Sequence, residues 1–189
     1  MIVQSNRNSN EEENMVQPQH IKEAQAGRSW LQGGIAAFVA TGPMSLFMLA
    51  TQRFLPRRQQ YALPPEIIME ELAHRMHVRW HMNKKQVEAA TLVSHFGYGA
   101  AMGMLYGASG KKIPLPSPVK GVLFGLVVWA ASYLGLLPLI GMAESGQREP
   151  GKRNLMMIAA HVVWGATMGF VAEVLTDKVS SGDDTLPMA

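Results

Sequence analysis

The sequence predicts an all-α integral membrane protein: a bundle of four transmembrane helices, arranged as two similar hairpins, with one amphipathic helix on its surface. Only 16% of the 189 residues are Asp, Glu, Lys or Arg, against about 25% in an ordinary soluble domain. None of these charges falls inside four windows, residues 29–52, 89–110, 121–143 and 154–172. Because about 20 apolar residues form a helix that crosses ~30 Å of hydrocarbon, each window is long enough for a span.

The chain begins with a polar segment, residues 1–28, which contains the run Glu11-Glu12-Glu13 and almost nothing to bury. We expect a solvated tail that becomes ordered only when a partner holds it. The first span follows at about 30–54, and Gly42-Pro43 in its middle predicts a kink or a break.

A second helix is expected at about 64–82, because Pro64-Pro65 suits a first helical turn. It carries too many charges to cross a bilayer. Its apolar residues fall within one third of the circumference, which is typical of a helix that lies on the membrane surface. The remaining elements are three spans at about 87–108, 119–142 and 155–175, which complete a membrane domain of residues 29–175, and a short tail at 176–189.

The second and fourth spans share the pattern His-x-x-aromatic-Gly-Ala-x-Met-Gly, at residues 95–103 and 161–169. This agreement indicates a duplicated helical hairpin. Since His95 and His161 share a stripe with glycines spaced by four, we expect both imidazoles to face the bundle interior at one depth. Close helix packing is expected at Gly99, Gly103, Gly107, Gly165 and Gly169.

Three interpretations of the histidine pair stay open. In the first, each imidazole makes a structural hydrogen bond to a neighbouring helix. In the second, the two ligate a b-type haem or another tetrapyrrole. In the third, they belong to a proton, ion or copper path, with Glu173 as a partner for protons. Copper is included among these ions because Met44-x-x-x-Met48 resembles a pattern of trimeric copper transporters.

A second candidate site lies on the predicted surface helix. Glu70, His74, His77 and His81 would share one face of a helix over 64–82, and this spacing can bring imidazoles and a carboxylate to one metal ion. The alternative is a solvated polar face.

Other classes of function lack support in the sequence. The chain has no cysteine, and it contains no phosphate-binding loop, nucleophile elbow, zinc-protease motif or dinucleotide fingerprint. Basic and aromatic residues do not alternate, so we expect no nucleic-acid partner. The net charge of +3 fits Lys and Arg beside lipid phosphate.

One resemblance rests on Leu63-Pro64-Pro65, on residues 148–154 (Arg-Glu-Pro-Gly-Lys-Arg-Asn) and on residues 159–165 (Ala-Ala-His-Val-Val-Trp-Gly). The chain resembles small bacterial inner-membrane proteins of the YagU-like kind over about residues 30–175. The resemblance implies a bacterial inner-membrane location and no particular activity. Two classes of function remain: an accessory or structural subunit that packs against larger membrane partners or its own copies, and a cofactor or ion carrier that uses His95 and His161. We expect no catalysis, because little mass lies outside the spans.

Overall fold

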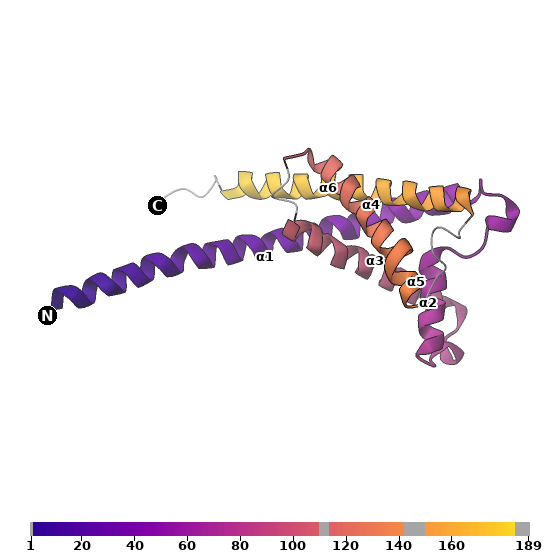
Figure 1. Cartoon of the computed structure of the whole chain (residues 1–189), viewed down its shortest axis with the longest axis horizontal. Helices are drawn as coiled ribbons and strands as arrows, with labels where there is room; N and C mark the ends of the chain where they lie inside the picture. The colour runs from indigo at the N-terminus through magenta and orange to yellow at the C-terminus, as the bar shows by residue number, and fades with distance from the viewer. Residues whose placement is uncertain (1, 110–113, 142–149, 184–189) are drawn as a thin grey trace.

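The computed structural model describes residues 2–109, 114–141 and 150–183, with side chains over 27–109, 114–141 and 150–178. Within these residues the chain is all-helical, as predicted. The helices are α1 (Ile2–Gln52), α2 (Pro64–Arg75), α3 (Lys84–Ser109), α4 (Ser117–Ala130), α5 (Leu137–Leu139) and α6 (Gly151–Asp183). Two 3-10 turns, η1 (Arg57–Gln59) and η2 (Arg79–His81), and a π-helical segment, η4 (Ala131–Leu136), complete the described elements (Figure 1).

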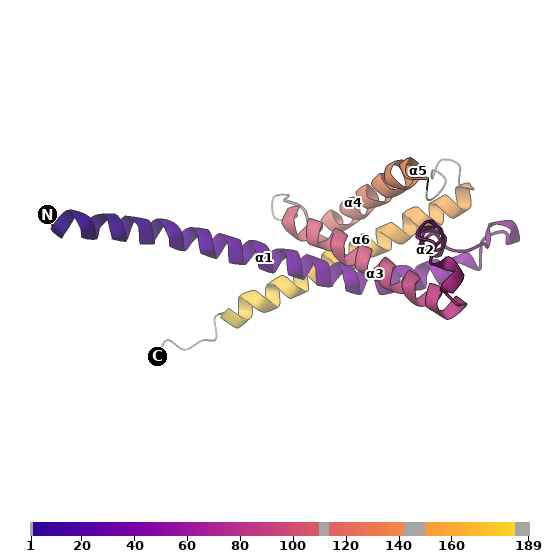
Figure 2. The same ribbon diagram turned by 90° about the horizontal axis from the view of Figure 1, so that it is seen from below.

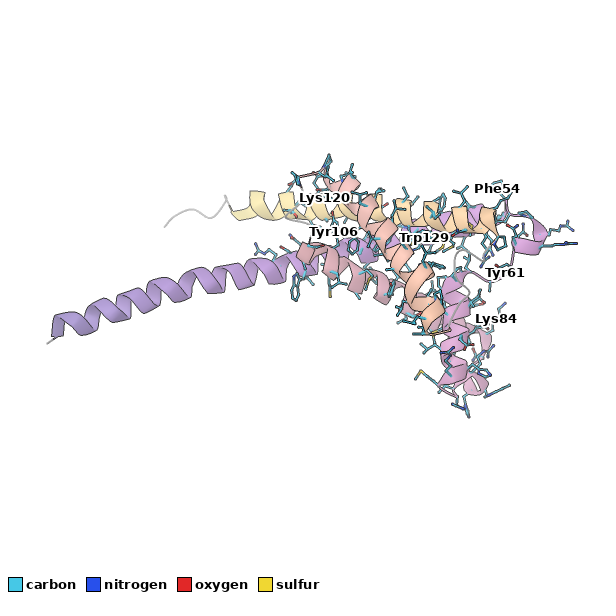
Figure 3. All side chains as sticks on the ribbon, in the orientation of Figure 1. Phe54, Tyr61, Lys84, Tyr106, Lys120 and Trp129 are labelled. Atoms are coloured by element: carbon cyan, nitrogen blue, oxygen red, sulfur yellow. The ribbon has the colours of Figure 1, made fainter. Side chains whose placement is uncertain are left out.

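Two pairs of helices make most of the packing. α1 lies along α3, α4 lies along α6, and α1 also crosses α6, so the two pairs join into one bundle (Figure 2). α2 packs mainly on α3 and points away from the bundle in Figure 1. The start of α1 and the end of α6 lie on the same side of the bundle in both views, and Phe54 and Tyr61 lie at the opposite end (Figure 3).

Three of the helical stretches are long and apolar enough to cross a membrane: 27–52, 117–139 and 151–178. Their outward side chains are apolar, and Leu46, Val127 and Leu155 each expose more than 60% of their surface. The interior instead contains polar side chains such as Thr41 and Ser132. Large apolar patches on the outside indicate a nonaqueous surrounding, so these are the features of an integral membrane protein in contact with lipid.

The N-terminal segment differs from the expected tail. α1 begins at Ile2 and runs without interruption into the first predicted span, and this half of the helix projects beyond the other helices (Figures 1 and 2). Extending an existing helix costs far less than starting one, so a polar segment joined to a packed span continues as helix. The predicted break at Gly42-Pro43 is also absent, because membrane helices tolerate proline where neighbouring groups satisfy the freed backbone.

The third predicted span is not a uniform α-helix. Its middle, Ala131–Leu136, winds as a π-helix before α5 begins. Pro138 has no N–H to offer the carbonyl four residues earlier, and its ring crowds that carbonyl. A wider turn relieves this crowding, and π turns of this kind occur frequently at functional sites.

The surface helix is shorter than predicted. α2 ends at Arg75, and His77 adopts a positive φ of 59°. The predicted helical face over 64–82 is therefore wrong beyond Arg75, because a residue with positive φ turns the chain out of the right-handed helix.

Candidate functional site

A cavity of about 340 Å³ lies where α1, α2, α3, the apolar stretch 117–139 and α6 meet. Most of its wall is apolar, formed by residues such as Met44, Met48, Ile68, Val128, Leu137 and Met157. Polar groups enter from four elements: Thr41 on α1, His95 and Tyr98 on α3, Ser132 and Tyr133 on η4, and His161 and Trp164 on α6. The structure thus brings both histidines of the repeated pattern to the wall of one cavity.

His161 is almost fully buried on α6. Its Nδ1 lies 2.8 Å from the carbonyl oxygen of Met157, one turn earlier in the same helix. A carbonyl oxygen only accepts hydrogen bonds, so Nδ1 carries the proton and donates it. In the neutral imidazole Nε2 then holds a lone pair. The ring edge also meets the Tyr133 ring, with centroids 6.1 Å apart.

His95 differs from His161 in its hydrogen bonding. Its Nε2 is buried and has no hydrogen-bond partner among the described residues. A buried polar atom without a partner costs about 1–3 kcal/mol, and such atoms in native proteins call for an explanation such as a ligand or bound water. His95 therefore leaves an unsatisfied polar group at the cavity.

Three hydrogen bonds connect helices around this cavity. The hydroxyls of Tyr98 and Ser132 lie 2.9 Å apart and join α3 to η4. Trp164 Nε1 donates to Thr41 Oγ1 at 3.3 Å and to the Ala37 carbonyl at 3.2 Å, joining α6 to α1. The hydroxyls of Tyr98, Ser132 and Thr41 are therefore hydrogen-bonded within the protein. The two imidazoles can each form a further hydrogen bond to a ligand.

The five glycines singled out in the sequence lie at close helix contacts. A Cβ atom at Gly103 or Gly107 would collide with the backbone of Gly33 or Ser29 on α1, and one at Gly99 would collide with Thr41. On the other pair, a Cβ at Gly165 or Gly169 would collide with backbone atoms of α4. These approaches hold α3 against α1 and α6 against α4, which fixes the direction in which each imidazole points.

Arg153 is an anchor that the sequence pattern did not reveal. It is fully buried, and its guanidinium donates to the carbonyls of Ala62 at 2.6 Å, Gln59 at 3.2 Å and Tyr61 at 3.3 Å. The same group stacks 3.7 Å from the centroid of the Tyr61 ring. Arg153 thus ties the start of α6 to the segment between α1 and α2.

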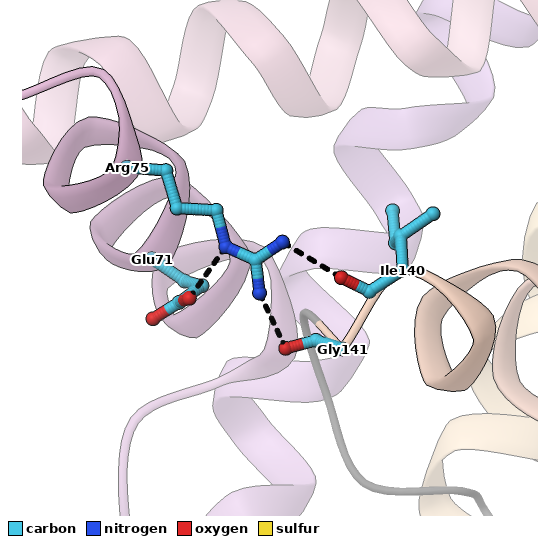
Figure 4. Close-up of polar contacts among 4 residues, drawn as sticks. All are labelled: Glu71, Arg75, Ile140 and Gly141. Atoms are coloured by element: carbon cyan, nitrogen blue, oxygen red, sulfur yellow. Dashed lines mark hydrogen bonds and ion pairs between the residues drawn. The ribbon is translucent and has the colours of Figure 1, made fainter.

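Arg75 ties α2 to the two residues that follow α5 (Figure 4). It donates to the carbonyls of Ile140 at 2.7 Å and Gly141 at 2.8 Å while pairing with Glu71 at 2.7 Å. Helix carbonyls at a C-terminus lack intrahelical partners, so a cation is well placed there. Because Pro65 and Ile68 of α2 line the cavity, this contact holds α2 over it.

The predicted metal site on the surface helix does not assemble as expected. Glu70 instead pairs with Arg79 at 3.4 Å, and His74 lies beside the ring of Trp80 with centroids 6.2 Å apart. His77 and His81 follow the end of α2. Within the part of the chain that the structure describes, no group of three or more His, Cys, Asp or Glu residues is placed to hold a metal.

The geometry also argues against two interpretations of the histidine pair, the haem site and the proton path through Glu173. A volume of about 340 Å³ is at the low end of the ~300–1,000 Å³ found for ligand pockets, so the cavity suits a small molecule better than a tetrapyrrole macrocycle. Glu173 lines a separate cavity of about 260 Å³, together with Gln32 and Lys120. It is thus not among the residues around the two imidazoles.

The chain was compared with known proteins. No curated protein and no solved structure matches it. One family model, described as a protein of unknown function (DUF1440), matches residues 44–170. The matched segment includes both imidazoles, the π-helical segment and the two arginine anchors. Because the match covers well over half of the sequence, the chain belongs to the DUF1440 family of proteins of unknown function.

Proposed function

We propose that this membrane protein binds a small lipophilic molecule in the cavity between its helices, with His95 and His161 as the polar recognition groups. The supporting observation is that two imidazoles from different helices reach one mainly apolar cavity. Ligand pockets are usually apolar with a few well-placed polar groups, and the spaces between bundle helices are among their common locations. The proposal belongs to the cofactor or carrier class, and the accessory-subunit role remains a prediction without a specific observation in its favour.

We also propose that α3 crosses the membrane, which gives four spans. Its 26 residues correspond to about 39 Å of helix, enough to cross the hydrocarbon. Its polarity comes from its charged first turns, from His95 at the cavity and from Gly99, Gly103 and Gly107, which face the bundle. Its exposed side chains include Leu92, Val93 and Leu105. The start of α1 and the end of α6 lie on the same side of the bundle, which agrees with an even number of spans.

The duplicated hairpin is a proposal that the packing supports. Gly103 and Gly107 meet the carbonyls of Gly33 and Ser29, and Gly165 and Gly169 meet those of Gly121 and Ser117. Each hairpin is thus a helix pair in which two glycines four residues apart lie against the partner's backbone, although the first hairpin makes this contact one turn later in the histidine pattern than the second. The YagU-like grouping and the bacterial inner-membrane location stay predictions of the sequence.

Ligand binding is testable through Trp164, which lines the cavity and is 3% exposed. Purified protein in mild detergent is titrated with 4-bromoanisole, an apolar probe whose heavy atom quenches nearby indole fluorescence. We expect a saturable component of quenching that Trp164→Phe removes. The other tryptophans give only the unsaturable background of a probe dissolved in the micelle.

A matched pair of variants locates the binding. Val128 lines the cavity, whereas its neighbour Val127 faces outward with 62% exposure. Val128→Phe fills the cavity and should abolish saturable quenching, while Val127→Phe should preserve it. Saturable quenching that persists in Val128→Phe, or that never occurs in the natural protein, contradicts the proposed function.

The number of spans is tested with single cysteines, because the natural chain contains none. Lys84→Cys and Leu115→Cys place thiols at the start of α3 and after its end. If α3 crosses the membrane, a membrane-impermeant maleimide labels only one of them in sealed vesicles. Labelling of both from the same side would exclude the four-span arrangement.

A further inference from the structure

We infer that the molecule bound in the cavity is a neutral lipophile with a hydroxyl group, an alcohol or a phenol, whose O–H donates to His161 Nε2. This inference rests on the proposed function and specifies its ligand. It follows from three properties of the cavity: the protonation of His161, the unsatisfied nitrogen of His95, and the kinds of side chain in the wall.

The first property is a free acceptor. The bond from His161 Nδ1 to the Met157 carbonyl fixes the proton on Nδ1, so Nε2 of the neutral ring can only accept. Within the described part of the chain no hydrogen bond to this Nε2 is formed. A ligand that satisfies it must supply a donor. A ketone, quinone, ether or ester presents only acceptors and leaves this nitrogen unpaired.

The second property is the neighbouring unsatisfied nitrogen. His95 Nε2 is buried without a partner, and His95 lines the same cavity. A hydroxyl both donates and accepts, so a hydroxyl that donates to His161 can also accept from His95 once that ring turns an N–H toward the cavity. An apolar ligand would satisfy neither imidazole.

The third property is the lack of charge in the wall. Among the residues that the structure describes, those that line the cavity include no Lys, Arg, Asp or Glu. A carboxylate or phosphate would be buried there without a cation, and an ammonium without an anion, which is strongly unfavourable in an apolar site. The ligand is therefore neutral, and the volume of about 340 Å³ leaves most of its surface to apolar contact with methionine and aliphatic side chains.

A soft metal ion is the competing occupant. Met44, Met48 and Met157 line the cavity with the two imidazoles, and thioether and imidazole groups are ligands of Cu(I). A single ion would leave most of the cavity empty, so the volume favours the organic ligand. Metal analysis of the natural protein, purified without chelator, distinguishes the two. Stoichiometric copper that is lost in both His95→Phe and His161→Phe would overturn the inference.

The test compares 4-bromophenol with 4-bromoanisole, which share an apolar ring and differ in the O–H. Saturable quenching of Trp164 is measured for each, normalised to the probe's partition into the micelle, with Val128→Phe as the blank. One added hydrogen bond should make the phenol bind about 2- to 12-fold more tightly. His161→Phe should reduce this ratio to about 1.

His161→Gln keeps an acceptor near the position of Nε2 and should retain part of the preference, which separates loss of the acceptor from damage to the fold. Size-exclusion elution of each variant is measured in parallel. Equal affinities for the two probes in the natural protein, or a preference unchanged in His161→Phe, refute the hydroxyl inference while the proposed function stands. Failure of both probes to saturate refutes both.

Discussion

Replacing Arg153 with alanine should be the most destabilising single change at the periphery of the bundle. The short bond to the Ala62 carbonyl counts as one charge-assisted bond, and the two longer bonds from one Nη1, to Gln59 and Tyr61, together count as a second. At about 1.5–3 kcal/mol each, with about 1–2 kcal/mol for the buried stack on Tyr61, truncation should cost about 4–8 kcal/mol. Desolvation of the guanidinium lowers the net figure toward the smaller value.

The assay is thermal unfolding in mild detergent, followed by tryptophan fluorescence and by recovery of the monodisperse size-exclusion peak. Arg153→Ala should lower the midpoint by about 10 °C or more, taking about 2–4 °C per kcal/mol for a chain of this size. Arg153→Lys should recover only part, because an ammonium lacks the planar fork and the stacking face. Lys152 is exposed, so Lys152→Ala is the control. A midpoint within 2 °C of the natural protein for Arg153→Ala, at this ~2–4 °C per kcal/mol, would show that the buried arginine contributes nothing.

The remaining predictions concern packing and the position of α2. Gly165→Leu should push α6 away from Gly121 and lower the stability by about 1–3 kcal/mol or more, as over-packing of a core does. Gly97→Leu is the control and should not, because Gly97 has open space around it. Equal effects of the two variants on the size-exclusion peak would contradict this. Arg75→Ala should speed hydrogen exchange of the α2 amides, since it removes the bonds to Ile140 and Gly141, and Glu71→Gln should do so less. Unchanged exchange in Arg75→Ala would mean that α2 is held by other contacts. Trp164→Phe should cost about 1 kcal/mol, because Thr41 keeps its bond to the Ala37 carbonyl; a loss several times larger in thermal unfolding would argue against this assignment.

Much of the architecture could be predicted because it depends on averages over a whole helix. The charge-free windows predicted both ends of α3 and one end each of α1, α4 and α6 to within about five residues, since a span needs a fixed length of apolar chain. The other ends differ, because α1 begins at Ile2, α4 ends at Ala130 and α6 continues to Asp183. The repeated histidine pattern pointed to two side chains that the structure places on one cavity. The charge-free windows and the repeated histidine pattern each extend over many residues, so a local irregularity in the helix does not hide them.

Features that depend on single residues or on contacts between distant parts of the chain could not be predicted from the sequence. Nothing in residues 76–82 marks the end of α2, so a helical wheel continued past Arg75 grouped histidines that the fold separates. The π-helical segment had only Gly135 and Pro138 as local hints. Arg153 binds carbonyls about ninety residues earlier, a relation that no local pattern encodes. Its position beside the predicted fourth span suggested an interfacial charge.

The π-helical segment has a consequence for how this chain tolerates insertions and deletions. The buried residues within 117–139 run Gly121, Gly125, Val128, Ser132 and Tyr133, and then resume at Leu137. A π turn closes its hydrogen bonds five residues apart, so this segment holds one residue more than an α-helical turn would. Deleting a single residue within 131–136 would let an ordinary α-helix form, and the segment after it would keep its direction because the wide turn already holds the extra residue. Ile140 and Gly141 would stay near Arg75, so a homologous chain that is one residue shorter here can keep both partners unchanged.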